Sequence, residues 1–399
     1  MVTKIENKII DILKKYFWII ILAFGFLGGL YVRKKGLYMV SFDMDLYILP
    51  WMNTLKENNG FAGLALNFSD YYIPYLCILA IGSYLDPSKW VLYVKAISII
   101  FETAFAGAGA LIAYKLLKEN KKDTRWAAAV FCVLILSPMI VVNGSFWGQC
   151  DYIYGTFVLL AIYFLISEKY TLAMNMLGIA LIFKFQTVFI VPVFVLVWLC
   201  NKKFRLWKFV FIPMWYLLGG LPAIIAGRPA ASVYSIYLNQ TSTYQQLTLN
   251  VPNIYTFFPN AYNDFSTWGI IATAGILFVL ALWAVIQNCE LSNRAIVGLC
   301  MCTLGICGMF LPAMHERYIT LYVGFVYIYY LIYSKKKVVI AGVLDMMVCM
   351  TYFWSLWGTE FPREFAVVTH MGILFFIIYD VVKVIKEDKS IKDEMCQKD

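Results

Sequence analysis

The sequence has few charged residues and almost no histidine. Of its 399 residues, 14% are charged and 62% are hydrophobic, and only two are histidines. A soluble domain cannot bury so much apolar surface, whereas a lipid bilayer accepts it directly. Neither His315 nor His370 lies near a serine-nucleophile motif, so the sequence does not support a catalytic triad built on serine.

Motifs for metals, nucleotides and secretion are also missing. The ten cysteines lie mostly in apolar runs, without CxxC or Cys/His spacing, and no glycine-rich phosphate loop occurs. Asp43 and Asp45 form an Asp-x-Asp pair, but two carboxylates alone are a weak metal signal. We therefore expect no metal and no cofactor. Residues 1–16 are amphipathic and charged, and no small-residue cleavage site follows, so we expect no cleavable signal.

The positive charge is placed where it orients a membrane protein. The net charge of +9 does not indicate a nucleic-acid partner, because Lys and Arg collect in short loops between apolar runs. Lys118–Arg125, Lys202–Lys208 and Lys335–Lys337 all fall on the cytoplasmic side if Tyr71–Leu85 stays in the first outer loop instead of crossing.

We predict an all-α polytopic protein of a cell membrane, with about twelve spans and both termini cytoplasmic. The predicted spans are Phe17–Val32, Trp90–Leu117, Trp126–Val142, Tyr152–Ile166, Tyr170–Phe183, Thr187–Cys200, Phe209–Ala226, Gly269–Ile286, Ala295–Leu311, Ile319–Tyr333, Val338–Leu356 and Val367–Val382.

The polar motifs gather at the outer ends of these spans. Pro50, Gly60 and Pro74 interrupt the first outer loop, residues 33–89, which argues against a continuous span and favours short helices on the membrane surface. Its many aromatic residues fit a membrane–water boundary. A second long outer loop, residues 227–268, is rich in Tyr, Asn, Gln and Thr. We divide the chain there, into a catalytic transmembrane module of residues 1–226 and a C-terminal module of residues 227–399.

Two cations lie at membrane depth beside these outer ends. Arg317 opens a span and Lys184 sits between two phenylalanines, so both are suited to the phosphate of a lipid-linked substrate. Lys184 could instead reach to the outer interface, and Arg317 could pair internally with Glu316 or Glu102. His315 could equally be a structural histidine. We expect Glu102, in mid-span, to be a buried partner.

Four motifs occur in a characteristic order. They are DMDLYILPW with NFSDYYIPY, then NGSFWGQCD, FKFQ and MHERY. Together they resemble the GT-C class of membrane glycosyltransferases, which use polyprenyl-phosphate sugars as donors. Within this class the chain resembles bacterial Gpi18-like mannosyltransferases and, more distantly, the ER glucosyltransferases that use dolichyl-phosphate glucose.

The resemblance implies an inverting transfer of a hexose, mannose or glucose, to a lipid-linked or cell-envelope glycan on the extracytoplasmic face. It implies that Asp43 is the general base and that Arg317, with Lys184 and His315, binds the donor phosphate. Further candidates are Asp45, Trp51, Tyr71 and Tyr75 for the acceptor or for loop support, and Trp147, Gln149, Asp151, Gln186 and Glu316 for sugar contacts.

Two other functions remain open at this point. A flippase for a lipid-linked saccharide would place polar residues along a path through the bilayer, often in two repeated halves. A polymerase or ligase for lipid-linked polysaccharide also uses outer-loop arginines and histidines, and the loop 227–268 is compatible with it. The donor separates these functions, because a glycosyltransferase of this class consumes a polyprenyl-phosphate monosaccharide and a polymerase a diphosphate-linked oligosaccharide.

Overall fold

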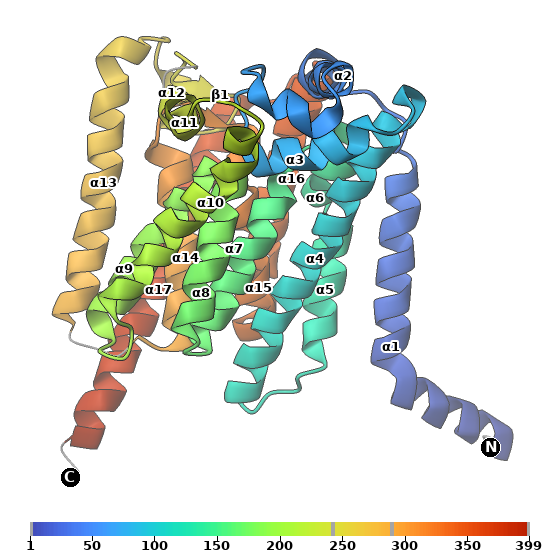
Figure 1. The fold of residues 1–399 in the computed structure, drawn as a ribbon. Coiled ribbons are helices and arrows are strands. Elements are labelled where there is room, and N and C mark those ends of the chain that lie inside the picture. The colour runs from blue at the N-terminus through green and yellow to red at the C-terminus, as the bar shows by residue number, and fades with distance from the viewer. Residues whose placement is uncertain (1–2, 241–243, 288–290, 397–399) are drawn as a thin grey trace.

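The computed structural model describes residues 3–240, 244–287 and 291–396, and it is helical nearly throughout (Figure 1). Its helices are α1 (Lys4–Lys34), α2 (Leu49–Glu57), α3 (Ile73–Ser83), α4 (Trp90–Glu119), α5 (Trp126–Leu136), α6 (Pro138–Val141), α7 (Asp151–Ile166), α8 (Tyr170–Phe183), α9 (Val191–Cys200), α10 (Phe211–Ile225), α11 (Ala230–Tyr234), α12 (Ile236–Gln240), α13 (Tyr262–Ile286), α14 (Asn293–Phe310), α15 (Thr320–Tyr333), α16 (Val338–Trp357) and α17 (Arg363–Cys396). Short 3-10 or π-helical turns connect several of them.

The apolar runs that were predicted to span the membrane coincide with helices, and one of them, Trp126–Val142, is divided between α5 and α6. Within the described residues, six helices are long and apolar enough to cross a bilayer, and a bent pair counted as one span makes seven. The six are Pro87–Glu119, Leu206–Ile225, Tyr262–Ile286, Asn293–Phe310, Lys335–Trp357 and Arg363–Ser390. The structure thus supports a helical membrane protein, and the count of twelve spans stays a prediction.

The bent pair has a clear local cause. Residues 126–136 and 138–147 meet at an angle of 49°. Pro138 begins the second segment, where its missing N–H breaks the backbone ladder. The chain after the break forms a π-helical turn, Val142–Trp147, which ends at Gly148 with a φ of 84°. This left-handed conformation favours glycine, and it turns the chain into α7.

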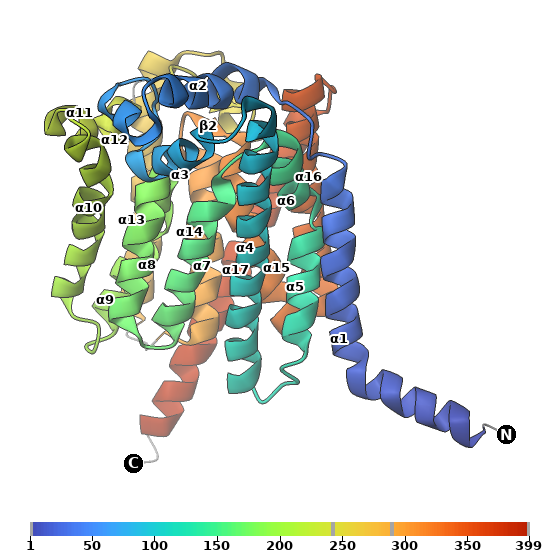
Figure 2. The same cartoon turned by 45° about the vertical axis from the view of Figure 1, so that its right-hand side comes forward.

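The connecting loops gather at one end of the helical bundle. Helices α2, α3, α11 and α12 lie at this end, while α1 begins and α17 ends at the other (Figures 1 and 2). Helix α3 has 11 residues, about 16 Å, which is half of what a span needs. Its length and position agree with the prediction that Tyr71–Leu85 belongs to the first loop.

Two details differ from the expected architecture. The second long loop is shorter than residues 227–268, because α13 already begins at Tyr262. A parallel strand pair also departs from an all-α fold, formed by β1 (Thr248–Leu249) and β2 (Met314–His315). Strands of two residues are too short to show an alternation of apolar and polar side chains, so the sequence could not predict them. The pair ties the second loop to the MHERY motif.

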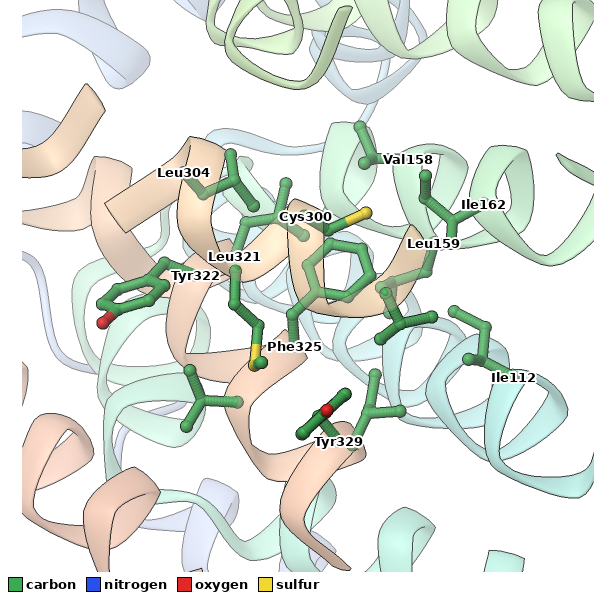
Figure 3. Packing of buried hydrophobic residues seen from close by; sticks show 14 of the residues in the cluster. Ile112, Val158, Leu159, Ile162, Cys300, Leu304, Leu321, Tyr322, Phe325 and Tyr329 are labelled. Atoms are coloured by element: carbon green, nitrogen blue, oxygen red, sulfur yellow. The ribbon is translucent and has the colours of Figure 1, made fainter. Parts of the chain in front are cut away.

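The hydrophobic core lies where α4, α7, α14 and α15 meet (Figure 3). Figure 3 shows Ile112, Leu159, Cys300 and Phe325, one from each of these helices, packed together. Helix α15 is buried on almost every side, which is the pattern of a central helix. The turn between α14 and α15 therefore brings the MHERY motif to the middle of the looped end.

A cysteine-labelling experiment tests the arrangement of the two ends. In a variant otherwise free of cysteine, Asn239→Cys on α12 and Asn120→Cys after α4 place exposed thiols at opposite ends. We expect a membrane-impermeant maleimide to label residue 239 on intact cells and residue 120 only after permeabilisation. Labelling of both from the same side would contradict the arrangement.

Candidate functional site

A cavity of about 360 Å³ opens at the looped end of the bundle. Its walls come from the first loop, the second loop, the segment after α8 and the MHERY motif. The polar side chains among its lining residues are Asp43, Asp70, Gln149, Lys184, Gln186, Gln240, His315 and Arg317. Both predicted modules therefore contribute to one site. This size and mixture of apolar walls with a few polar groups are typical of a small-molecule site.

Asp43 is held by three partners from distant parts of the chain. Its Oδ2 accepts hydrogen bonds from Trp147 Nε1 at 3.1 Å and from Gln149 Nε2 at 2.5 Å. Arg317 Nη1 lies 3.5 Å from the same oxygen. About a quarter of the Asp43 side chain is exposed, toward the cavity. These contacts orient a carboxylate that a ligand can still reach.

Asp45, two residues after Asp43, lies in a different environment from Asp43. The chain is helical from Asp43 through the π-helical turn Met44–Ile48, so side chains two residues apart point in different directions. Asp45 is exposed and does not line the cavity. The expected role of Asp45 at the acceptor is therefore not supported by its position.

Arg317 pairs with acids other than those expected. Besides Asp43, it meets Asp151, whose Oδ2 lies 3.9 Å from Arg317 Nε. Asp151 also forms an ion pair with Lys184 and accepts a hydrogen bond from Asn143 Nδ2 at 3.0 Å. The predicted alternative of a pair with Glu316 or Glu102 is wrong, because both of those carboxylates face other residues.

Lys184 does not reach to the interface. Its side chain is only 5% exposed, and its ammonium is bonded to Asp151 and lies over the ring of Tyr318 at 5.0 Å. Two cations and two carboxylates, from Lys184, Arg317, Asp43 and Asp151, thus balance each other in a partly dry site. Both cations also line the cavity, where an anionic ligand can contact them.

His315 lines the cavity as a neutral ring. The side chains of Tyr244 and Tyr318 pack edge-on against it, with ring centroids 5.1 and 5.2 Å away. Burial lowers the pKa of His315, and the nearby charge of Arg317 lowers it further. His315 can therefore offer a hydrogen bond to a phosphate at neutral pH but no positive charge.

Three of the expected sugar contacts are covered by other residues. The ring of Trp147 packs edge-on against Tyr352 at 5.2 Å and lies under the Arg317 guanidinium, so it offers no face to a sugar. Asp151 is buried beneath Lys184, and Glu316 accepts a hydrogen bond from Ser355 Oγ at 2.9 Å. None of the three lines the cavity.

The remaining candidates divide between the cavity wall and its support. Gln149, Gln186, Trp51 and Tyr71 line the cavity, as expected for residues that contact a substrate. Tyr75 lies behind the wall, where its ring packs against that of Tyr71 at 5.2 Å. Loop support is therefore the role that its position allows.

The turn that carries Trp147 and Gln149 rests in a cradle of polar side chains. Ser41 Oγ donates to the carbonyl of Trp147 at 2.6 Å, and Ser98 Oγ donates to that of Gln149 at 2.9 Å. Lys95 Nζ donates to the carbonyl of Phe146 at 2.5 Å. Because buried carbonyls need donors, these bonds fix the backbone that aims both side chains at Asp43.

A buried ion pair lies directly below this cradle. Arg33 Nε bonds Glu102 Oε2 at 2.5 Å, and Arg33 Nη1 donates to the carbonyl of Ile135 at 2.7 Å. The prediction that Glu102 is a buried partner is confirmed. Its other oxygen faces Gly144, where an added Cβ would lie 1.8 Å from it.

Sequence reasoning missed several residues of the site. Asp70 lines the cavity, and Lys95 and Ser98 hold the turn, but none of them was singled out. Lys95 carried a readable signal, since it is a cation inside an apolar run. Asp70 lies within the NFSDYYIPY motif but was given no role there, and only the folded structure brings it to the cavity.

The described part of the chain offers no cluster of metal ligands beside this site. Across residues 3–240, 244–287 and 291–396, no group of three or more His, Cys, Asp or Glu side chains could hold a metal ion. Searches with protein-family models and among curated proteins find no match to this chain.

Two glycine substitutions test the importance of the cradle. Gly144→Ala puts a methyl group against Glu102, and such overpacking costs about 1–3 kcal/mol. Gly107→Ala on α4 is the matched control, because its Cβ would meet nothing within 4 Å. We expect thermal unfolding in detergent, followed by intrinsic fluorescence, to show a clear loss of stability for Gly144→Ala alone. Equal stability of the two variants would contradict the tight contact.

Proposed function

We propose that the chain is a membrane glycosyltransferase that transfers a hexose, mannose or glucose, from a polyprenyl-phosphate sugar to a glycan or glycolipid acceptor. One observation carries the proposal: a reachable carboxylate, Asp43, and a buried guanidinium, Arg317, meet on the wall of one cavity. A base and an anion-binding cation in contact are what transfer from a sugar phosphate requires. A second support is the resemblance to the GT-C class, which rests on the four motifs and their order.

The proposed reaction is a single displacement. Asp43 takes the proton of an acceptor hydroxyl while that oxygen forms a bond to the anomeric carbon of the donor sugar. The bond from this carbon to the phosphate oxygen breaks on the opposite side, so the configuration inverts. The polyprenyl phosphate leaves as an anion, and Arg317 and Lys184 stabilise its charge.

The ion pairs of the site suggest how donor binding prepares the base. Arg317 is 3.5 Å from Asp43, so an arriving phosphate competes with this carboxylate for the guanidinium. Once the phosphate takes that contact, the Asp43 carboxylate is released from Arg317 and can accept the proton of the acceptor hydroxyl. Trp147 and Gln149 keep the carboxylate oriented during the exchange.

The proposed setting is a cell membrane, with the cavity on the extracytoplasmic face and both termini in the cytoplasm. The twelve-span arrangement would leave the aromatic first loop at the outer interface, where the phosphate of a lipid-linked donor lies. Polar side chains gather at one end of the bundle, which favours an enzyme at one membrane surface over a flippase with a polar path across.

Replacing Arg317 tests the phosphate site. In an assay of sugar loss from polyprenyl-phosphate mannose, glucose, galactose or arabinose, Arg317→Ala should lower kcat/KM by on the order of 100-fold, as expected for a charge-assisted contact. Arg317→Lys should recover part of the loss, because the charge remains without the planar fork. Arg125→Ala, at an exposed ion pair between α4 and α5, is the control and should behave as wild type.

Normal donor kinetics in a folded Arg317→Ala protein would rule out the assignment. Because Asp43 and Asp151 lose a partner in this variant, thermal unfolding should be measured alongside to separate weak donor use from misfolding.

Replacing the two acids of the first loop tests the base. Asp43→Asn keeps the shape but removes the proton acceptor, so turnover should fall by about 100-fold to 10,000-fold. Donor binding should be kept or become tighter, because the lost interaction belongs to the transition state and asparagine competes less with the phosphate for Arg317. Asp45→Asn should keep most of the activity, since Asp45 is exposed outside the cavity. An active Asp43→Asn protein would show that the base is another group.

A further inference from the structure

Within the part of the chain that the structure describes, Asp70 differs from Asp43 and Asp151 in having no ion-pair partner. Asp43 and Asp151 are both bonded to cations and neutral donors. Within the described residues, the Asp70 carboxylate forms no ion pair and accepts no hydrogen bond from another side chain, although it lines the same cavity. Its only local donor is its own backbone N–H. Since Arg317 and Asp43 already satisfy each other, Asp70 is the acid left available to a ligand.

The backbone around Asp70 is held firmly in place. Gln240 Nε2, at the end of α12, donates to the carbonyl of Asp70 at 2.6 Å. Three residues earlier, Arg228 Nη2 donates to Asn67 Oδ1 at 2.6 Å, and Tyr71 N donates to Ser69 Oγ at 3.0 Å. The second loop is thus bonded to the first at Asn67 and at Asp70 itself, so the Asp70 carboxylate is presented from a fixed segment.

The surroundings of Asp70 fit a neutral ligand. Burial raises its pKa, while its own backbone N–H, Arg317 and Lys184 act in the opposite direction. The charges of these two cations are therefore felt at Asp70, and they would oppose a positively charged ligand there. A hydroxyl group is the suitable partner, because it donates to a carboxylate without bringing charge.

Aromatic rings also line the cavity that Asp70 faces. Tyr47, Trp51, Tyr71, Tyr237 and Tyr244 all line the cavity. A sugar ring has apolar C–H faces and hydroxyl groups at its edge, so it can pack on such rings and donate to a carboxylate at once. A fixed carboxylate among aromatic rings is therefore suited to a saccharide.

Resting on the proposed glycosyltransferase function, we propose that Asp70 binds hydroxyl groups of the neutral sugar in this cavity and thereby selects which sugar is used. The sugar is either the acceptor or the hexose of the donor. Asp43 then acts on the reacting hydroxyl, and Asp70 determines which other hydroxyls must be present. Removing a matching hydroxyl from the sugar should have the same effect as removing the carboxylate.

The test measures binding by tryptophan fluorescence, which needs no transfer reaction. Wild type and variants in nanodiscs, free of sugar detergents, are titrated with methyl mannoside, methyl glucoside and their single-deoxy forms, and separately with polyprenyl-phosphate mannose and glucose. Asp70→Asn should weaken binding of one of these groups at least tenfold, and Asp70→Glu should recover part of it. Asp86→Asn in the same loop is the control, since asparagine also caps the turn at Ser88.

The outcomes separate this inference from the proposed function. Weaker binding of the glycosides assigns Asp70 to the acceptor, and weaker binding of the donors assigns it to the donor hexose. In either case one deoxy sugar should bind wild type and Asp70→Asn equally. Unchanged binding in Asp70→Asn, or a loss confined to turnover, would overturn the inference. If the hydroxyl dependence holds but no polyprenyl-phosphate sugar is consumed, Asp70 binds sugars and the proposed reaction is wrong.

Discussion

The buried contact of Arg317 with Asp43 and Asp151 is the interaction on which the site depends. A guanidinium withdrawn from water is costly unless carboxylates and hydrogen bonds compensate it. Asp43 comes from the first loop, Asp151 from the start of α7 and Arg317 from the turn before α15. The need to pair this one cation therefore joins three segments that are distant in the sequence. Lys184 balances the second carboxylate, so these two cations and two carboxylates compensate each other.

The broken helix before α7 makes this meeting possible. At the break, Asp345 accepts hydrogen bonds from Ser137 Oγ at 2.8 Å, from Met139 N at 2.9 Å and from Tyr327 Oη at 2.9 Å. These bonds satisfy backbone and hydroxyl groups that a broken helix leaves open inside the bundle. The chain beyond the break is then free to run as the turn that aims Trp147 and Gln149 at Asp43.

Much of this could be predicted from the sequence, for physical reasons that differ among the residues. Long apolar runs predict helices, because backbone groups inside a bilayer or a protein core must bond to each other. Glu102 was recognised because a charge in the middle of a span must have a partner. Arg317 and Lys184 were recognised for the same reason. Their partners were not, because pairing depends on which loops meet in space. Trp147 was expected to face a sugar and instead donates to Asp43, and Asp70 was part of a quoted motif in which it was assigned no role.

The central claim is that a polyprenyl-phosphate sugar is the donor, and the lipid product tests it most directly. Purified protein is incubated with polyprenyl-phosphate hexoses and, separately, with a diphosphate-linked oligosaccharide, each with an alkyl glycoside acceptor, and the lipids are identified by mass spectrometry. We predict that one polyprenyl-phosphate hexose is converted to free polyprenyl monophosphate. If every such donor stays intact and polyprenyl diphosphate appears instead, the chain is a polymerase or ligase and the account is contradicted.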